Sequence, residues 1–337
     1  MAKLGEVCEV LDSKRVPITA ANRVSGQYPY YGANGVQDYV ADYIFDDELV
    51  LLAEDGGNFG SKEKPIAYRV SGKCWVNNHA HVLRPKAVID VDYLCYSLMF
   101  YDVSGLVNGA TRQKLTQSDM RKMEIPLRTM VEQKKIVCRL NKLTELISLR
   151  KQQLTKLDEL VKARFVEMFG DPIRNDKHFV QKTGKSLFCF SSGKFLQEEK
   201  RFQHGFPVYG GNGITWYTDI PLVKKPTIII GRVGAYCGNV RMVNVPVWIT
   251  DNAIYIKEFK TRELNLHFLL MLMKYMKFSN YADYSGQPKI TQKPLETLIY
   301  IVPPLELQNR FAAFVERVDQ QKQTVQQSLE KLELVKK

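Results

Sequence analysis

Two acidic residues beside a glycine-rich turn are the first candidates for chemistry in this sequence. Glu54 and Asp55 lie in LLAEDGGNFG, where paired carboxylates could act as the acid pair of a nuclease. A second stretch, TIIIGRVGAYCG, repeats the aliphatic-then-glycine pattern but has Gly231 and Arg232 at the corresponding positions. Because a duplicated enzyme is expected to keep both of its sites, the sequence does not favour a nuclease.

The histidines and cysteines do not form a recognisable metal-binding pattern. His79 and His81 would share one face of a strand with Cys74 nearby, but no fourth ligand follows at a suitable spacing. The six cysteines are at least 21 residues apart and form no CxxC motif. No metal is expected, and reduced thiols in the cytoplasm are the plain interpretation.

Cofactor motifs are also missing from the sequence. GGNFGSK (56–62) lacks the spacing of a P-loop, and GRVGAYCG (231–238) is not G-x-G-x-x-G. The tetrapeptide VPPL (302–305) does not match the [DN]-P-P-[FYW] motif of a DNA amino-methyltransferase. We therefore expect no catalytic residues and no cofactor bound by this chain.

Polar and aromatic residues in loops shared by the two halves are the better candidates, and their chemistry is binding. Arg and Lys suit guanine or phosphate, whereas Asn and Gln suit adenine. Core packing is the alternative for the tyrosines, and ordinary surface charge is the alternative for the lysines. The candidate DNA-binding residues are Tyr31, Asn34, Arg112, Gln113 and Lys114 in the first half and Tyr209, Asn212, Arg232, Gln287 and Lys289 in the second.

The two halves are similar in sequence. YYGANG (30–35) matches VYGGNG (208–213), CWVNNHA (74–80) matches VWITDNA (247–253), and RQKLTQ (112–117) matches QPKITQ (287–292). The landmarks keep their order, and their offsets drift only from 173 to 178 residues. This pattern predicts an internal duplication.

A helical stretch with a heptad pattern follows each half. The two seams have the same phase, which predicts an intramolecular antiparallel coiled coil. The alternatives are that each helix packs on its own globular unit or on another chain. Arg150 interrupts the first seam, and Lys322 and Lys336 interrupt the second. The seam residues are Ile136, Leu140, Leu143, Ile147, Leu154, Leu157 and Val161, and Phe311, Val315, Val318, Val325, Leu329 and Leu332.

Short strand patterns mixed with helical ones predict an α+β fold. Residues 73–85 and 246–258 are each expected to form paired strands. The expected domains are 1–130, the first globular domain; 131–170, the central helix; 171–304, the second globular domain; and 305–337, the C-terminal helix.

Net charge is unevenly distributed along the chain. The total is +12, but residues 1–130 contain 15 Lys and Arg against 16 Asp and Glu, a net charge of −1. Residues 171–304 contain 18 against 10, a net charge of +8. The overall basic character favours a polyanionic partner.

The combined motifs resemble the DNA specificity subunits of type I restriction–modification systems, over nearly the whole chain. The resemblance depends on YPYYGANG and FPVYGGNG, on GATRQKLTQSDMRKMEIPL (109–127) and SGQPKITQKPLETLIYIVPPL (285–305), and on LTKLDELVKARFVEMFGDP (154–172). It implies two target recognition domains, each followed by a conserved helix that also docks modification subunits.

The implied function is site selection without catalysis. The chain would read a bipartite sequence in double-stranded DNA. Two modification subunits would supply S-adenosylmethionine and adenine methylation, and a restriction subunit, where one is present, would use ATP.

Two alternatives remain open from the sequence. One is a twin-module DNA-binding accessory protein outside restriction; the other is a self-contained nuclease or methyltransferase with divergent motifs. MAKLGEV is not a signal peptide, and the most apolar run, 264–276, is too short to span a bilayer, so a cytoplasmic protein is expected.

Overall fold

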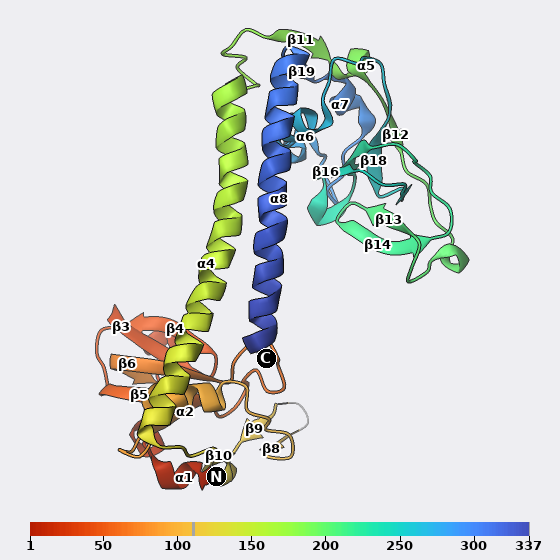
Figure 1. Cartoon of the computed structure of the whole chain (residues 1–337). Coiled ribbons are helices and arrows are strands. Elements are labelled where there is room, and N and C mark those ends of the chain that lie inside the picture. Colours follow the sequence, from red (N-terminus) through yellow and green to blue (C-terminus); the bar gives the residue numbers. More distant parts are fainter. Residues whose placement is uncertain (110–111, 337) are drawn as a thin grey trace. The chain divides into compact units, whose positions relative to one another are not determined.

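The computed structural model describes residues 1–109 and 112–336. It divides into two compact units, residues 1–146 and 147–335, with Lys336 assigned to the first. Helix α4 (Met130–Phe169) is continuous and contributes residues to both units (Figure 1).

The first unit is built on a six-stranded sheet with the order β2-β7-β5-β6-β3-β4. The strands are β2 (Cys8–Val10), β3 (Ser25–Gly32), β4 (Gly35–Val40), β5 (Phe45–Ala53), β6 (Ala67–Val76) and β7 (Ala80–Pro85). Strand β5 is antiparallel to both β6 and β7 and lies between them. The expectation that residues 73–85 form paired strands is therefore wrong. Every residue from Leu49 to Ala53 is buried, as a central strand covered on both faces requires.

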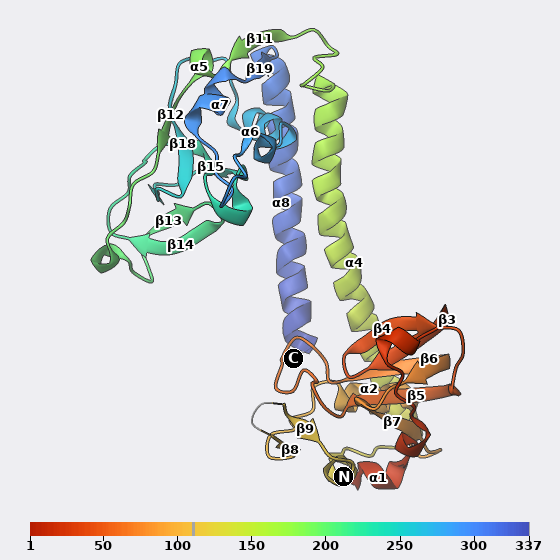
Figure 2. The same cartoon turned by 180° about the vertical axis from the view of Figure 1, so that it is seen from behind.

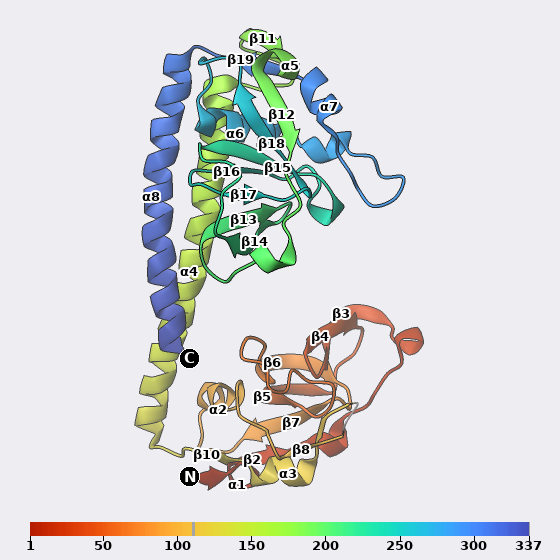
Figure 3. The same cartoon turned by 90° about the vertical axis from the view of Figure 1, so that its right-hand side faces the viewer.

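Two apolar clusters cover the two faces of this sheet. Helix α2 (Val91–Leu98) packs on one face (Figure 3), and Asp90 caps it by accepting from the backbone N–H groups of Asp92 and Tyr93. The remaining short elements are α1 (Leu4–Val7), α3 (Gln117–Lys122), β1 (Ala2–Lys3), β8 (Val107–Asn108), β9 (Lys114–Leu115) and β10 (Glu124–Ile125).

The second unit repeats this order in two smaller sheets, β12-β18-β15-β16 and β14-β13-β17 (Figure 3). Figure 2 shows β12, β18 and β15 of the first of these sheets and the β13–β14 hairpin of the second. Where the first unit has the single strand β6, the second has β16 and β17, separated by a segment that contains Pro246. Proline has no N–H to donate to a ladder, which accounts for the break. Within residues 246–258, β17 pairs with β13 and not with β18. The expectation that this stretch forms paired strands is therefore also wrong. The strands are β12 (Phe188–Ser192), β13 (Phe206–Gly210), β14 (Gly213–Thr218), β15 (Thr227–Gly231), β16 (Val240–Val243), β17 (Trp248–Ile249) and β18 (Ala253–Phe259).

The helices of the second unit share its main core. Phe165 and Phe169 near the end of α4 contact Phe268 of α6 and Phe311 of α8, with ring centroids 4.7–5.9 Å apart. The other elements of this unit are α5 (Gly184–Leu187), α6 (Leu266–Tyr275), α7 (Gln292–Thr297), α8 (Leu305–Lys336), β11 (Val180–Thr183) and β19 (Ile299–Val302).

Within the second unit, α8 runs antiparallel to residues 147–169 of α4. Two interhelical ion pairs fix the direction: Lys322 Nζ lies 2.5 Å from Asp158 Oδ1, and Lys151 Nζ lies 2.8 Å from Glu333 Oε1. From Lys151 to Asp158 the numbering rises along α4, whereas the partners on α8 fall from Glu333 to Lys322. The intramolecular antiparallel coiled coil is confirmed.

The predicted seam residues are buried to different degrees. Ile147, Val161, Phe311, Val315, Val318, Val325 and Leu329 are buried, whereas Ile136, Leu140, Leu143, Leu154, Leu157 and Leu332 are half-buried. The interrupting residues Arg150 and Lys322 are also half-buried, and the Arg150 guanidinium donates to Gln153. No helix in the described part of the chain is long and apolar enough to cross a membrane.

Candidate nucleic-acid interface

Three segments of the first unit meet at the carboxyl end of β5. The Glu54 N–H donates to the carbonyl of His79 (2.9 Å), and the Leu115 N–H donates to the carbonyl of Glu54 (2.7 Å). Asp55 and Lys114 face each other as an antiparallel bridge pair. The backbone therefore holds the acidic loop and the basic loop side by side.

Four of the predicted binding residues lie at this junction. Arg112, Gln113 and Lys114 are exposed on the basic loop. The Arg112 Nη2 group donates to Asp55 Oδ1 (2.9 Å), and Asn34 donates through Nδ2 to the carbonyl of Gly56 (3.0 Å). Turn 32–35 is thereby attached to the same cluster.

Tyr31 points away from this group. Its ring lies 5.7 Å from the Tyr68 ring within the second apolar cluster, and burial raises its pKa. Its carbonyl accepts from the Asn77 N–H (3.0 Å). Core packing was the alternative role for the tyrosines, and the position of Tyr31 agrees with it. A base contact by Tyr31 stays a prediction.

A buried ionic network lies beneath the basic loop. His81 directs Nδ1 at Asp12 Oδ2 (2.6 Å) and Nε2 at the carbonyl of Leu115 (2.9 Å). A carbonyl only accepts, so Nε2 carries the proton of that hydrogen bond. Arg15 pairs with Glu54 (2.6 Å), which also receives Lys114 Nζ (3.0 Å).

The electrostatics of this network favour charged carboxylates. Burial alone raises the pKa of Asp12, but the hydrogen bond and charge of His81, the Val82 N–H and Arg15 outweigh it, so the pKa is lowered. For Glu54, burial is likewise outweighed by the hydrogen bonds from Arg15 and Lys114, and its pKa is lowered.

Among the residues that the structure describes, one group of side chains lies close enough together to hold a metal ion, and it belongs to this network. Asp12, Glu54 and His81 offer ligand atoms within 4.8 Å of one another, and Cys74 is not among them. These atoms already face Arg15, Lys114 or the ring of His81. The arrangement therefore fits an ion-pair network that fixes the basic loop from below.

The second unit has the same backbone junction with other side chains. The Arg232 N–H donates to the carbonyl of Asn252 (2.9 Å), the Ile290 N–H donates to the carbonyl of Arg232 (2.9 Å), and Val233 is bridged to Lys289. By these bonds, Arg232 has the position in the second unit that Glu54 has in the first, and Val233 has the position of Asp55. The sequence alignment, which set Gly231 and Arg232 against the two acids, is therefore shifted by one residue.

In both units a glycine with positive φ comes two residues after the equivalent positions Glu54 and Arg232. Gly56 has φ +61° and Gly234 has φ +76°, values that favour glycine. A Cβ on Gly56 would lie 3.3 Å from Arg112 Nη2, and one on Gly234 would lie 3.5 Å from Gln287 Nε2. Gln287 thus occupies the position of Arg112.

The remaining candidates of the second unit lie near this junction or in the core. Asn212 is exposed, and its carbonyl accepts from Arg241 (2.8 Å). Arg232 is half-buried and donates to the carbonyl of Asp251 (3.2 Å), whereas Gln287 and Lys289 are exposed. Tyr209 is half-buried against an apolar cluster, like Tyr31.

Sequence reasoning missed several residues that shape this region. Asp12, Arg15 and His81 are far apart in the sequence and carry no local motif. Outside this junction, sequence reasoning also missed Gln133 and Gln308, which are fully buried at the starts of α4 and α8. A signal for the glutamines was present, because each is a polar residue on the inward face of a helix at an offset of 175.

The comparisons with known proteins match this architecture. The family model described as "Type I restriction modification DNA specificity domain" matches residues 1–159 and 179–334. The chain belongs to this family. It is a type I specificity subunit with an internal repeat.

Individual relatives agree with this assignment. A Haemophilus influenzae protein assigned as a type I restriction enzyme specificity subunit is 27% identical over 358 aligned positions, covering 94% of this chain and 86% of the relative. The Escherichia coli EcoprrI specificity subunit is 30% identical over 122 residues, 36% of this chain and 30% of its own.

Solved structures share the fold. The specificity subunit from M. genitalium has a TM-score of 0.65 at 19% identity, covering 99% of this chain and 92% of its own. A chain from a study of complex assembly and conformational transition of the type I system has a TM-score of 0.60 at 17% identity, covering 99% and 94%.

Proposed function

We propose that this specificity subunit reads a bipartite site in double-stranded DNA, with one half-site contacted by each recognition domain. The observation that carries the proposal is the repeated junction. Equivalent backbone hydrogen bonds hold Asp55, Arg112 and Lys114 together in the first unit. In the second unit they hold Val233, Gln287 and Lys289 at the same positions. One scaffold with different hydrogen-bonding side chains is what two half-sites of different sequence require.

Charge supports a polyanionic ligand for the second domain in particular. Residues 171–304 carry a net charge of +8, from 18 basic and 10 acidic residues. Lysines and arginines on such a surface neutralise phosphates and release counterions. Binding by the second domain should therefore depend more steeply on salt than binding by the first.

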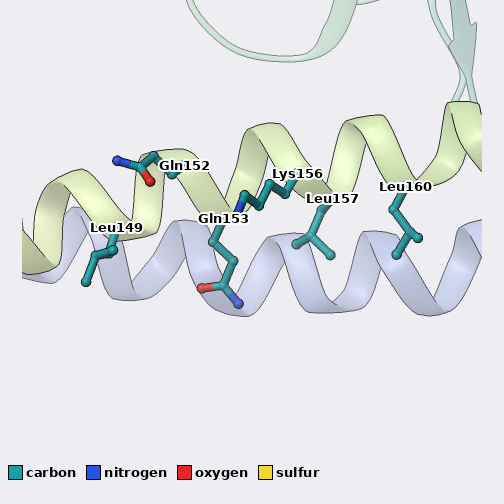
Figure 4. A pocket seen from close by; sticks show the side chains of 6 residues that line it. All are labelled: Leu149, Gln152, Gln153, Lys156, Leu157 and Leu160. Carbon is teal, nitrogen blue, oxygen red and sulfur yellow. The ribbon is translucent and has the colours of Figure 1, made fainter.

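The helices offer a surface for the modification subunits. Leu149 and Leu160 of α4 are 50% and 46% exposed, although the seam residues between them face α8. They line a shallow groove with Gln152, Gln153, Lys156 and Leu157 (Figure 4). An apolar strip along a helix suits another amphipathic helix, and we assign it to the two methyltransferase partners.

In this proposal the chain performs no chemistry itself. The acids that could serve a nuclease, Glu54 and Asp55, are paired with Arg15, Lys114 and Arg112. S-adenosylmethionine would bind to the modification subunits, and ATP to a restriction subunit where one is present. Adenine extrusion from the duplex would also be the partner's task.

The test is to co-express the full chain with two modification subunits from its own operon and to map methylated adenine by sequencing. We expect one bipartite sequence with a nonspecific spacer, and no methylation when the chain is omitted. The purified chain alone should not turn over S-adenosylmethionine. Methylation at a single uninterrupted sequence, or turnover by the chain alone, would refute the proposal.

A further inference from the structure

The ion pair between Arg112 and Asp55 carries an inference about how one half-site is read. Arg112 is 59% exposed at its side chain, whereas Asp55 is 18% exposed. The acid is thus fixed in the protein, and the guanidinium extends from it toward solvent. Because both the main chain and the side chain of Asp55 are constrained, its position is better defined than that of a surface carboxylate.

Two groups hold the Asp55 carboxylate in place. His79 contacts the same Oδ1 atom through Nδ1 at 2.6 Å, and the backbone of Asp55 is bridged to Lys114. The His79 backbone is itself fixed by a hydrogen bond from its N–H to Asn77 Oδ1 (2.8 Å). The carboxylate therefore presents one oxygen to Arg112 from a rigid support.

A fixed carboxylate changes what Arg112 can recognise. A guanidinium has five N–H donors. The Nη2 group donates to Asp55 Oδ1 and lies 3.3 Å from Nδ1 of His79, which itself contacts the same Oδ1, so the other donors remain for a ligand. Ordering a free arginine costs rotamer entropy, and a fixed partner reduces that loss on binding. The negative charge also opposes a phosphate at the same place. The pair thus favours a base edge.

We propose that Asp55 is a positioning residue that orients Arg112 toward guanine in the first half-site. Guanine offers the O6 and N7 acceptors that match two parallel guanidinium N–H groups. This inference rests on the proposed function and adds which residue sets base preference. The second unit has Val233 and Gln287 at the equivalent positions, so it reads its own half-site without this device.

The test uses the full chain assembled with its modification subunits and a set of duplexes that differ from the methylated site by one base pair. Asp55→Asn keeps the shape of the side chain and removes its charge. We expect preference for guanine at one position of the first half-site to fall on the order of tenfold. The second half-site should be unchanged, and affinity for unrelated duplexes should stay the same or rise.

Asp38→Asn is the matched control. It removes the same charge from the same unit, at an exposed carboxylate that pairs with Arg23 instead. Its base preferences should equal those of the wild type. If Asp38→Asn alters the same position as Asp55→Asn, the effect is one of general charge, and the positioning role is wrong.

Arg112→Ala provides a second variant at an exposed side chain. It should relax the same base position as Asp55→Asn, and the double variant should be no worse than Arg112→Ala alone. Unchanged preferences in Asp55→Asn, relaxation at two different positions, or equal weakening on all duplexes would overturn the inference while leaving the bipartite function intact. If the wild-type assembly methylates no bipartite sequence, both proposals fail.

Discussion

Gln133 and Gln308 make the same three hydrogen bonds in the two halves of the chain, at a constant offset of 175 residues. Gln133 accepts from the Asp90 N–H (2.8 Å) and donates to the carbonyls of Val88 (3.0 Å) and Arg128 (2.8 Å). Gln308 accepts from the Asn265 N–H (2.9 Å) and donates to the carbonyls of Glu263 (2.8 Å) and Pro303 (2.7 Å). Each glutamine therefore connects the start of a long helix to the N-cap of a shorter helix in the adjoining domain.

Replacing one of these glutamines should be costly. Gln308→Met keeps the length of the side chain but removes its donors and acceptor. The Asn265 N–H and two carbonyls then lose a buried partner, and we expect a loss of roughly 2–4 kcal/mol in the free energy of unfolding. Urea denaturation of the full chain, followed by circular dichroism, measures it.

Gln152→Met is the control for the glutamine variant, because Gln152 is exposed on α4. It should change the stability by less than about 0.5 kcal/mol. If both variants lose the same stability, the buried hydrogen bonds contribute nothing beyond the helix itself, and the glutamines do not anchor the long helices.

The coiled coil can be tested independently of the domain cores. Val325 is buried on α8 but is not part of the main core of the second unit. Val325→Asp places an unpaired carboxylate against α4 and should cost roughly 3–5 kcal/mol locally. We expect the C-terminal half of α8 to detach. Most of the helical circular dichroism signal should be retained, and protease cleavage should appear at sites C-terminal to Val318.

Gln327→Asp introduces the same charge two residues away at an exposed position. It should remain as resistant to protease as the wild type. A cooperative loss of all structure in Val325→Asp would contradict the view that the second domain keeps its own core when the helix pair opens.

The sequence predicted the parts of the fold that depend on local pattern. The heptad spacing indicated two long helices, and α4 (Met130–Phe169) and α8 (Leu305–Lys336) are the helices observed. Strand neighbours were beyond reach, because the position of β5 between β6 and β7 depends on pairing that no local signal encodes. Phe165 and Phe169 also lie off the predicted seam, because this end of α4 packs against Phe268 of α6 as well as Phe311 of α8.

The sequence identified the loops that meet at the junction in each unit but not the bonds between them. Both glycine turns and both basic loops were identified, and their repeated order follows from duplication. The pairing of Arg112 with Asp55 joins residues 57 positions apart, and that of His81 with Asp12 joins residues 69 apart. Such contacts depend on strand register, which only the folded chain defines.

Replacing Gln287 should alter the reading of the second half-site and leave the first half-site unchanged. Gln287 is exposed beside Gly234, at the position that Arg112 has in the first unit. If it reads a base, Gln287→Ala should cost roughly 1–3 kcal/mol on the cognate duplex and relax one position of the second half-site. Methylation mapping would show the first half-site unchanged. Uniform weakening on every duplex would instead indicate a contact with phosphate.

The buried network predicts a defined dependence of stability on pH. The pKa of Asp12 lies below its ordinary value of 3.8 despite burial, because His81, Val82 and Arg15 stabilise the charged form. The folded state therefore binds this proton more weakly than the unfolded state. The resulting stabilisation is fully present above about pH 4 and is lost as the pH falls through the lowered pKa.

Asp12→Asn removes this pH-dependent stabilisation and leaves His81 and Arg15 without their carboxylate. At pH 7 we expect a loss of roughly 3–5 kcal/mol, because one partner of a buried ion pair is gone. The difference from the wild type should shrink as the pH falls from 3.8 through the lowered pKa, since the wild-type carboxylate becomes protonated first in the unfolded and then in the folded state. Asp42→Asn, at an exposed carboxylate of the same unit, should track the wild type throughout. Denaturation curves from pH 3 to pH 7 measure the difference, and one that stays constant or grows on acidification would show that Asp12 stabilises the domain by its shape and not by its charge.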